Sequence, residues 1–563
     1  MITQKKVLEC DLLIAGGGAG GMQAAIDAAD AGLKVIVAEK ANTRRSGNGA
    51  TGNDHFMAYI PEVHGTEAEF LHALSYAQEA KGGKDKDLLI AFARNSFGVV
   101  KAWESYGIPM RPHDYWEFTG HCRPGGPKGV HLKYAGLEQK PILTKEALKR
   151  GVKILNRCPL TEIITNKQGE VCGGLCVDLN GEKPEVQVIR AKSLLIATAG
   201  SMMMNGSSSM GWMFNMIGCP ASTGVSTAGA YRAGARLVCL DGAVAPIGVS
   251  GCKYFNRGGK ATWVGVYTDI DGKPIGPFVD KPDWRYGDFT ADIFPQMFNM
   301  NFDKGNPVFM NCSEGTDYDI EYMKWALTHE GNGATLQHLE DEGFDFKKHM
   351  VEFNAKKGGG GGKGVGIDTF ANGETTVKGL YACGVAMGNG MVGIGAAATT
   401  GRIAALSAAE YCKTRELEPA EEMDIVAEAV AYYDRILSNE VSTATPTWQE
   451  AIIAIQQTMW DYLGSGIRSE KLFKVGLGHL ERLEKKIETL HCENNHEFLR
   501  CIEAMNTIQV AKLCMESSRS RKETRGAHKR ADFPFTDPSY DGKLMTVQKV
   551  DGKLVTGMRD MRK

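Results

Sequence analysis

The glycine-rich turn near the N-terminus constrains the fold of this chain more than any other feature. It spans Gly16–Gly21, is glycine except at position 19, and follows a short apolar run, Leu12–Ala15. An alanine-rich stretch, Met22–Ala31, comes next, and a second apolar run, Val35–Ala38, ends at Glu39. The apolar runs predict buried strands, and the stretch between them predicts a helix. The order strand, turn, helix, strand is typical of a βαβ unit.

The spacing Gly16-x-Gly18-x-x-Gly21 predicts that this turn binds the pyrophosphate of a dinucleotide. Gly16 permits the tight turn, Gly18 lets a phosphate touch the backbone, and Gly21 lets the helix pack closely against the strand. The first N–H groups of the helix have no intrahelical acceptor, so they favour an anion. Glu39, at the end of the second strand, can accept hydrogen bonds from ribose hydroxyls.

Length and charge limit what else the chain can be. With 563 residues it is too long for one compact core, so we expect several domains. Its 65 basic and 67 acidic residues leave a formal charge of -2, which argues against nucleic-acid binding. The N-terminus has no apolar signal core, and no later run of about twenty apolar residues could span a bilayer. We therefore expect a cytoplasmic protein that is not inserted into a membrane.

The 14 cysteines bear on redox chemistry. They are scattered, and no two of them form a CxxC pair. Scattered cysteines in a chain without a secretion signal are typical of reduced thiols in a reducing compartment. An iron–sulfur cluster needs clustered thiolates, so we expect no metal centre in this chain and assign any cluster to a partner.

Several further segments resemble motifs of the fumarate reductase and succinate dehydrogenase flavoproteins, and they occur in the same order as in that family. These segments are Glu39–Gly52, Ala197–Gly200, Thr376–Gly384, Arg521–His528 and Asp532–Pro534. The first resembles the family's flavin-pyrophosphate segment, the third its second flavin strand, and the last two its terminal signature. Within the family, Ser46-Gly47 and the stretch Arg521–Thr524 look closest to the adenylylsulfate reductase alpha subunit.

The resemblance implies an FAD-dependent oxidoreductase in which a hydride passes between flavin N5 and a substrate. The family often attaches FAD covalently through a histidine in the segment that matches Gly47–Asn48. No histidine stands there, so the resemblance implies non-covalent FAD. The residues assigned to FAD by the motif and the resemblance together are Gly16, Gly18, Ala19, Gly20, Gly21, Glu39, Lys40, Ser46, Gly47, Thr51, Gly52, Leu160, Ala197, Thr198, Ala199, Gly200, Gly384, Gly393, Ile394 and Ala397.

The chain departs from the family where the substrate binds. Members that act on dicarboxylates use a His-Pro-Thr-Gly motif, and the matching stretch, Ala245–Gly248, begins with alanine. They also use an arginine before the last flavin helix, and Gly388–Met391 contains none. A buried carboxylate needs such donors. Adenylylsulfate reductase carries an arginine in the region matching Gly242–Ala243 and a histidine before that helix, and both are missing. We expect a substrate that is neither fumarate or succinate nor adenylylsulfate.

Candidates for acid–base chemistry are His131 and Lys133, although a loop histidine is more often a solvated or capping residue. Arg257 and Arg285, together with Lys253 and Tyr254, lie near the position of the family's catalytic arginine, and no motif selects one of them. The methionine- and aromatic-rich stretch 202–216 has two open interpretations. It could line a site for a bulky or apolar substrate, or it could be core packing.

The predicted fold is α/β, with a discontinuous Rossmann-like FAD-binding domain at 1–235 and 351–415. An α+β capping domain is expected as an insertion at 236–350. A helical domain at 416–515 and a C-terminal extension at 516–563 are expected to follow.

The predicted function is that of a flavoprotein subunit that acts on a small organic molecule and works as part of an oligomer. Its electrons are expected to pass to or from a ferredoxin-like iron–sulfur subunit. Two alternatives remain open. The chain could be an FAD electron-transfer subunit of a larger complex without its own small substrate, or an oxygen-dependent oxidase that needs no partner.

Overall fold

The computed structural model describes residues 4–79, 84–119, 130–204, 219, 221–242, 266–273, 306–313, 315–329, 333–353, 365–442, 444–464, 466–526 and 528–563. Its centre is a seven-stranded sheet in which the strand order is β6-β2-β1-β9-β8-β7 and β15 also pairs with β9. The strands are β1 (Gln4–Ala15), β2 (Val35–Glu39), β6 (Lys153–Asn156), β7 (Leu160–Thr165), β8 (Val171–Asp178), β9 (Glu185–Ile196) and β15 (Leu380–Ala382).

The part of the sheet around β1 is parallel and buried on both faces. Strand β1 pairs in parallel with β2 and β9, and β15 pairs in parallel with the end of β9. Leu12 and Ile14 belong to the core on one face, while Leu13 and Ala15 belong to the core on the other. Burial on both faces explains why the sequence shows uninterrupted apolar runs here rather than an alternating pattern.

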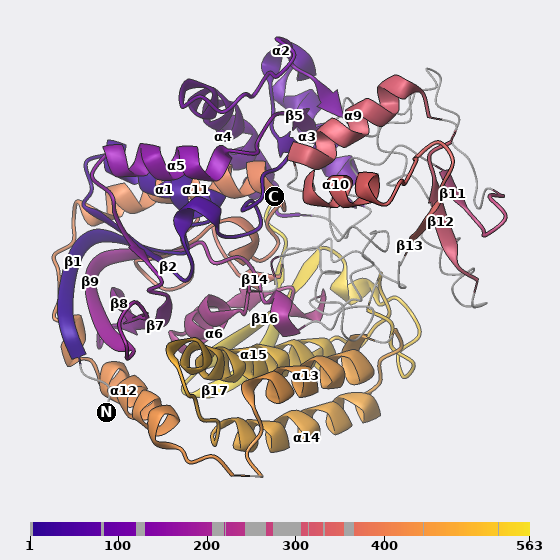
Figure 1. Cartoon of the computed structure of the whole chain (residues 1–563). Helices are drawn as coiled ribbons and strands as arrows, with labels where there is room; N and C mark the ends of the chain where they lie inside the picture. The colour runs from indigo at the N-terminus through magenta and orange to yellow at the C-terminus, as the bar shows by residue number, and fades with distance from the viewer. Residues whose placement is uncertain are drawn as a thin grey trace.

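Three helices cover one face of this sheet, as Figure 1 shows: α1 (Ala19–Asp30), α5 (Gln139–Lys149) and α11 (Ile394–Cys412). Helix α11 lies against α1, although some 370 positions separate them in the sequence. The crossing depends on glycine, because a Cβ on Gly401 would lie 2.3 Å from the carbonyl oxygen of Gly20. A Cβ on Gly20 would lie 2.8 Å from the carbonyl oxygen of Ala397. The two backbones can therefore approach closely only without side chains at these positions.

Helices α6 (Val225–Arg232), α12 (Asp424–Ser438), α13 (Trp448–Met459), α14 (Glu470–Ile487) and α15 (Asn495–Ser520) share the core of the opposite face. The last four lie in the part of the chain expected to be helical. Helix α15 is buried along most of its length, and it contacts α6, α13 and α14.

The C-terminal segment forms a hairpin that the sequence interpretation, a turn-rich extension, did not include. Strands β16 (Lys543–Val550) and β17 (Lys553–Asp560) pair with β10 (Leu237–Val238) and β14 (Gly366–Ile367) in the order β14-β10-β16-β17. Asp551 and Gly552 join the two long strands, and both have positive φ. An Asp-Gly pair between strands is a strong hairpin signal, so this turn could have been recognised from the sequence.

The remaining described elements flank the sheet. Strands β3 (His55–Met57), β5 (His131–Lys133) and β4 (Phe118–Thr119) form a small sheet, and the chain between β3 and β4 contains helices α2 (Pro61–His64), α3 (Glu67–Glu79) and α4 (Lys86–Ser105). Between 266 and 353 lie β11 (Val266–Thr268), β12 (Val308–Asn311), β13 (Val351–Phe353), α9 (Asp317–Leu327) and α10 (Gly333–Asp341). Among the described residues, no helix combines the length and the apolarity that a membrane crossing needs.

Candidate functional site

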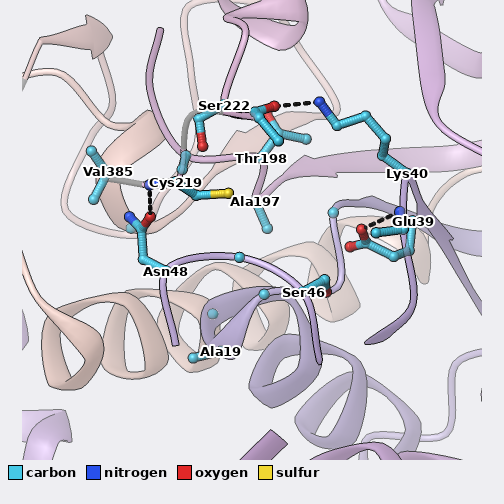
Figure 2. A pocket seen from close by; sticks show the side chains of 18 of the residues that line it. Ala19, Glu39, Lys40, Ser46, Asn48, Ala197, Thr198, Cys219, Ser222 and Val385 are labelled. Carbon is cyan, nitrogen blue, oxygen red and sulfur yellow. Dashed lines mark hydrogen bonds between the residues drawn. The ribbon is translucent and has the colours of Figure 1, made fainter. Parts of the chain in front are cut away.

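A cavity of about 530 Å³ lies where several strands of the central sheet end. Gly16 follows β1, Glu39 ends β2, Ala197 follows β9 and Cys383 follows β15, and all four line the cavity. Ligands of open α/β sheets bind outside the carboxyl ends of the strands, because the loops and helix N-termini there converge. This cavity is therefore the candidate ligand site, and Figure 2 shows part of its wall.

Most of the residues assigned to FAD from the sequence line this cavity. They are Gly16, Gly18, Ala19, Gly20, Glu39, Lys40, Ser46, Gly47, Leu160, Ala197, Thr198, Ala199, Gly384, Gly393, Ile394 and Ala397. Gly21, Thr51, Gly52 and Gly200 are not part of the lining. A Cβ on Gly21 would lie 1.9 Å from the carbonyl oxygen of Gly16, so this glycine allows the close packing of helix on strand. A Cβ on Gly52 would lie 2.1 Å from the carbonyl oxygen of His329, so its role is also in packing.

The N-termini of two helices meet at the cavity. Helix α1 begins after Gly18, and α11 begins after Gly393, where φ is 115°. Neither helix has a side-chain cap among the described residues. Their first N–H groups can therefore donate to a ligand, and the positive ends of both helix dipoles favour negative charge there. These features fit a pyrophosphate at α1 and an electron-rich ring edge at α11, which are both parts of FAD.

Glu39 organises the turn that precedes α1. Its Oε2 accepts from the N–H of Gly17 at 2.6 Å. Its Oε1 accepts from the N–H of Ala41 at 2.7 Å (Figure 2). Lys140 of α5 is fully buried behind the same turn and donates to the carbonyl oxygen of Gly17. Burial lowers the pKa of Lys140 to about 8, and the nearby Glu39 opposes that shift. Lys140 was not anticipated from the sequence, since nothing local to it indicates this contact.

Helix α15 closes one side of the cavity through Leu499, Ile502 and Glu503, which sequence reasoning also missed. The Nζ of Lys40 donates to Glu503 at 2.6 Å and also to the carbonyl oxygen of Ala221. Glu503 is fully buried and also accepts from Arg500. One signal was available, because Glu503 is an acidic residue directly between the apolar Ile502 and Ala504. Its partner became evident only in the folded chain.

The segment that resembles the family's flavin-pyrophosphate motif contacts the opposite wall. Asn48 Oδ1 accepts from the N–H of Cys219 at 2.6 Å, a contact visible in Figure 2. Thr198 donates through Oγ1 to the hydroxyl oxygen of Ser226 at 2.7 Å. Ala199 adopts φ of 60°, which costs a non-glycine residue about 1 kcal/mol and turns the chain after β9.

Of the residues predicted for proton chemistry, the structure describes His131 and Lys133, both on β5. Neither lines the cavity. The ring of His131 lies 5.5 Å from that of His55, which does line it. The other substrate-side predictions lie outside the described residues, namely Arg257, Arg285, Lys253, Tyr254, the stretch Ala245–Gly248 and most of the methionine-rich stretch.

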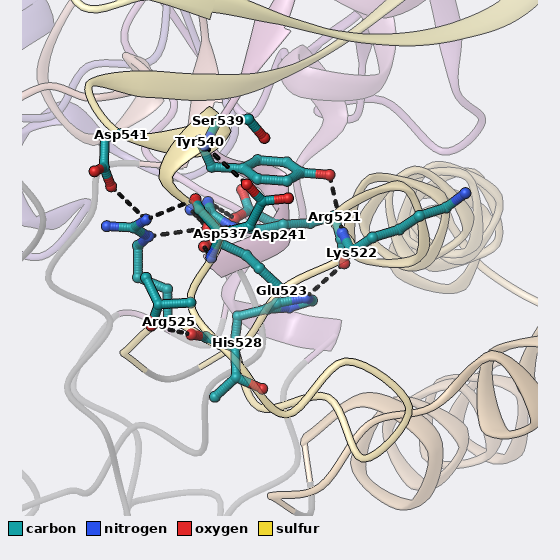
Figure 3. Close-up of polar contacts among 12 residues, drawn as sticks. Asp241, Arg521, Lys522, Glu523, Arg525, His528, Asp537, Ser539, Tyr540 and Asp541 are labelled. Carbon is teal, nitrogen blue, oxygen red and sulfur yellow. Dashed lines mark hydrogen bonds and ion pairs between the residues drawn. The ribbon is translucent and has the colours of Figure 1, made fainter.

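A second polar cluster, outside the cavity, is built by the segment that resembles the family's terminal signature (Figure 3). The NH1 of Arg521 donates to Asp241 Oδ2 at 2.7 Å, and both side chains are almost completely buried. Arg521 also pairs with Glu523, which in turn accepts from Arg525 at 2.9 Å. The signature therefore fixes the chain just after β10, at Asp241.

His528 belongs to the same cluster, and its ring is buried. Its Nδ1 lies 2.7 Å from the NH1 of Arg468. Burial and the adjacent Arg468 lower the pKa of His528 to about 4. The imidazole is consequently neutral near pH 7 and accepts through Nδ1, because a guanidinium can only donate.

Comparisons with known proteins agree with this geometry. Residues 11–248 match the FAD binding domain, and residues 453–554 match the fumarate reductase flavoprotein C-term domain. The chain is 23% identical over 556 residues to an uncharacterized FAD-dependent oxidoreductase of Methanocaldococcus jannaschii, covering 96% of each chain. It is 22% identical over 584 residues to one subunit of the fumarate reductase (CoM/CoB) of Methanothermobacter marburgensis, covering 98% of this chain and 100% of the other.

Solved structures show the same fold. Adenylylsulfate reductase from Archaeoglobus fulgidus superposes with a TM-score of 0.77 at 20% identity, covering 100% of this chain and 97% of the other. The FrdA chain of Escherichia coli quinol fumarate reductase superposes with a TM-score of 0.79 at 18% identity, covering 99% and 98%.

Proposed function

The chain belongs to the FAD-dependent oxidoreductases of the fumarate reductase and succinate dehydrogenase flavoprotein superfamily, and on this premise we propose that it moves an electron pair between FAD and a small organic substrate. The observation that carries the proposal is the cavity itself. Four strand ends and two helix N-termini surround it, and the residues assigned to FAD make up much of its wall. When bound there, FAD supplies hydride transfer and single-electron transfer.

The chain's own residues would hold the cofactor from both ends. The N–H groups at the start of α1 donate to the pyrophosphate, and Glu39 has lone pairs left for a ribose hydroxyl. The start of α11 stabilises negative charge at the ring end. We propose that binding is non-covalent, because positions 47 and 48 are glycine and asparagine where the family carries its attachment histidine.

We propose a substrate other than fumarate, succinate or adenylylsulfate, even though relatives are named for fumarate and adenylylsulfate. The support is chemical: Gly388–Met391, just before α11, contains no arginine or histidine, and Ala245 stands in place of the dicarboxylate-binding histidine. An anionic group bound without cationic donors would lose several kcal/mol on burial. A neutral or bulkier substrate fits these residues better.

We also propose that residues 236–350 form a capping domain and that an iron–sulfur protein exchanges electrons with the flavin. Support for a separate partner comes from the cysteines, since no group of three or more metal-ligating side chains is found within the described residues. A relative that is itself one subunit of a larger enzyme is consistent with this arrangement.

The decisive experiment is an anaerobic spectral titration of the purified FAD-loaded protein against candidate metabolites. Bleaching of the flavin bands by one class of organic substrate supports the proposal. Rapid reoxidation by air with stoichiometric peroxide would instead favour an oxidase. The absence of flavin absorbance, with no uptake of added FAD, would refute the proposal.

Two further measurements test its details. Acid precipitation should leave a colourless pellet and a yellow supernatant, because the FAD is not covalently attached. Fumarate reduction with a reduced viologen dye should be negligible, and brisk turnover would show that the assignment of Ala245 to the dicarboxylate motif is wrong.

A further inference from the structure

One histidine in the cavity wall is not explained by FAD binding alone. His55 begins β3, and it lines the cavity together with Asn53. The adenosine and pyrophosphate ends of a dinucleotide are accounted for by Glu39 and the turn before α1. The start of α11 remains for the flavin ring, and β3 packs against it, because a Cβ on Gly395 would lie 2.3 Å from the carbonyl oxygen of Met57. His55 therefore stands at the redox end of the site.

Asp54 holds the ring of His55 in a defined state. The distance from His55 Nδ1 to Asp54 Oδ1 is 2.6 Å. The carboxylate is completely buried, whereas 27% of the His55 side chain is exposed. A neutral imidazole that donates its Nδ1–H to a carboxylate carries its lone pair on Nε2. The contact therefore selects a tautomer that can accept a proton at Nε2.

Lys133 balances the charge of that carboxylate. Its Nζ pairs with Asp54 Oδ2, and both side chains are fully buried. Lys133 offsets much of the negative charge that Asp54 presents to His55. The carboxylate oxygen beside Nδ1 still stabilises the imidazolium once a proton arrives. This arrangement leaves His55 responsive to another charge in the cavity.

Within the described part of the chain, three neighbouring elements bear on the charge environment of His55. On β5, the ring of His131 meets that of His55 edge-on at 5.5 Å. From α9, the ring of Tyr322 lies beneath Lys133 at 5.5 Å, and its hydroxyl donates to Glu117 at 2.6 Å. Helix α11, which packs on β3, carries no charged side chain in its first two turns. A change of charge on a flavin bound in the cavity would act on His55 alongside these groups.

We propose that His55 takes up a proton at Nε2 when the bound flavin accepts an electron pair. The inference rests on the proposed function, because it requires FAD in the cavity. The electron pair comes from the reduced substrate or from an electrode, and the flavin itself binds one proton with it. His55 binds one more proton from solvent, which offsets the added negative charge, and releases it when the electrons leave. His55 is then the proton-exchanging residue of the site, while Asp54 and Lys133 are positioning residues.

The test is spectroelectrochemical titration of the FAD-loaded protein across the pH range, with viologen dyes as mediators. The slope of the midpoint potential against pH counts the protons taken up per electron pair. Between the pKa of the imidazole beside oxidised flavin and its higher pKa beside reduced flavin, we expect His55→Gln to take up about one proton fewer per electron pair than the wild type. His479→Gln, a histidine at an exposed position on α14, is the matched control and should behave like the wild type.

Three outcomes would overturn the inference. One is an unchanged proton count in FAD-loaded His55→Gln. Another is that His131→Gln takes up fewer protons per electron pair while His55→Gln takes up as many as the wild type, which would assign the proton to the ring of His131. If His55→Gln does not retain FAD, Asp54→Asn provides the test. Loss of the carboxylate should shift the pH range in which the additional proton is taken up to lower pH. An unshifted pH range refutes the proposal. If the wild type binds no FAD, the proposed function fails instead, so the two failures are distinguishable.

Discussion

We expect Gly18→Ala to weaken FAD binding while leaving the fold intact. Gly18 has φ of -65° and ψ of -176°, which any residue adopts without strain. A Cβ built there meets only the carbonyl oxygen of Ala197, at 3.9 Å. The apo protein therefore gives no steric reason for glycine at this position. If the pyrophosphate rests on this backbone, the added methyl group displaces it from the N–H groups of α1.

The free energy of FAD binding and the free energy of unfolding should respond differently to Gly18→Ala. Displacing a charged ligand from one backbone donor costs about 1.5–3 kcal/mol, which corresponds to about a 10- to 150-fold increase in Kd. Alanine is a poorer N-cap than glycine, which destabilises the fold, but it also restricts the unfolded chain, which stabilises it. The free energy of unfolding of Gly18→Ala should therefore stay within about 1 kcal/mol of the wild-type value. Quenching of FAD fluorescence by the apo protein measures Kd, and urea denaturation followed by far-UV circular dichroism measures stability.

Gly16→Ala is the matched comparison, because φ there is 96° and a Cβ would lie 2.7 Å from the carbonyl oxygen of Ala197. That variant should lose stability by more than about 1 kcal/mol as well as FAD affinity. If Gly18→Ala binds FAD as tightly as the wild type, the pyrophosphate does not rest on this turn, and the reasoning is refuted.

Other predictions concern the buried contacts. Arg521→Met should destabilise the protein by about 3–5 kcal/mol, because it removes the cation that is ion-paired with the buried carboxylate of Asp241. The partly exposed Arg525→Met should cost about 1 kcal/mol or less, and equal urea midpoints would contradict this. The pKa of His528 is lowered to about 4 in the folded protein, so the unfolded chain binds this proton more readily. The free energy of unfolding should therefore fall by about 3 kcal/mol as the pH drops from about 6.5 to 4. His528→Gln should flatten that part of the stability profile, and an unchanged profile would show that another group titrates. Gly401→Ala should disrupt the packing of α11 on α1 and lower the free energy of unfolding by about 1–3 kcal/mol. A wild-type midpoint in thermal or urea unfolding would mean that the two helices separate easily.

The hairpin at the C-terminus shows where sequence reasoning stopped short. Its turn, Asp551-Gly552, is a local signal that was present but not used. Its partner strands β10 and β14 are each only two residues long, so neither has a pattern of its own. Strand β10 forms because the long β16 offers hydrogen-bond partners, and β14 forms in turn on β10, so both are properties of the folded sheet.

The sequence by itself determined the first βαβ unit and the glycine turn, and with them the part of the cavity wall that this turn and Glu39 form. These depend on near neighbours, since a glycine spacing, an apolar run and a helix start act within a few residues. Only the tertiary structure placed Lys140 behind the turn, Glu503 against Lys40, and His55 on Asp54 and Lys133. A sequence pattern can indicate that a side chain is buried, but its partner is set by packing between elements that lie up to hundreds of residues apart.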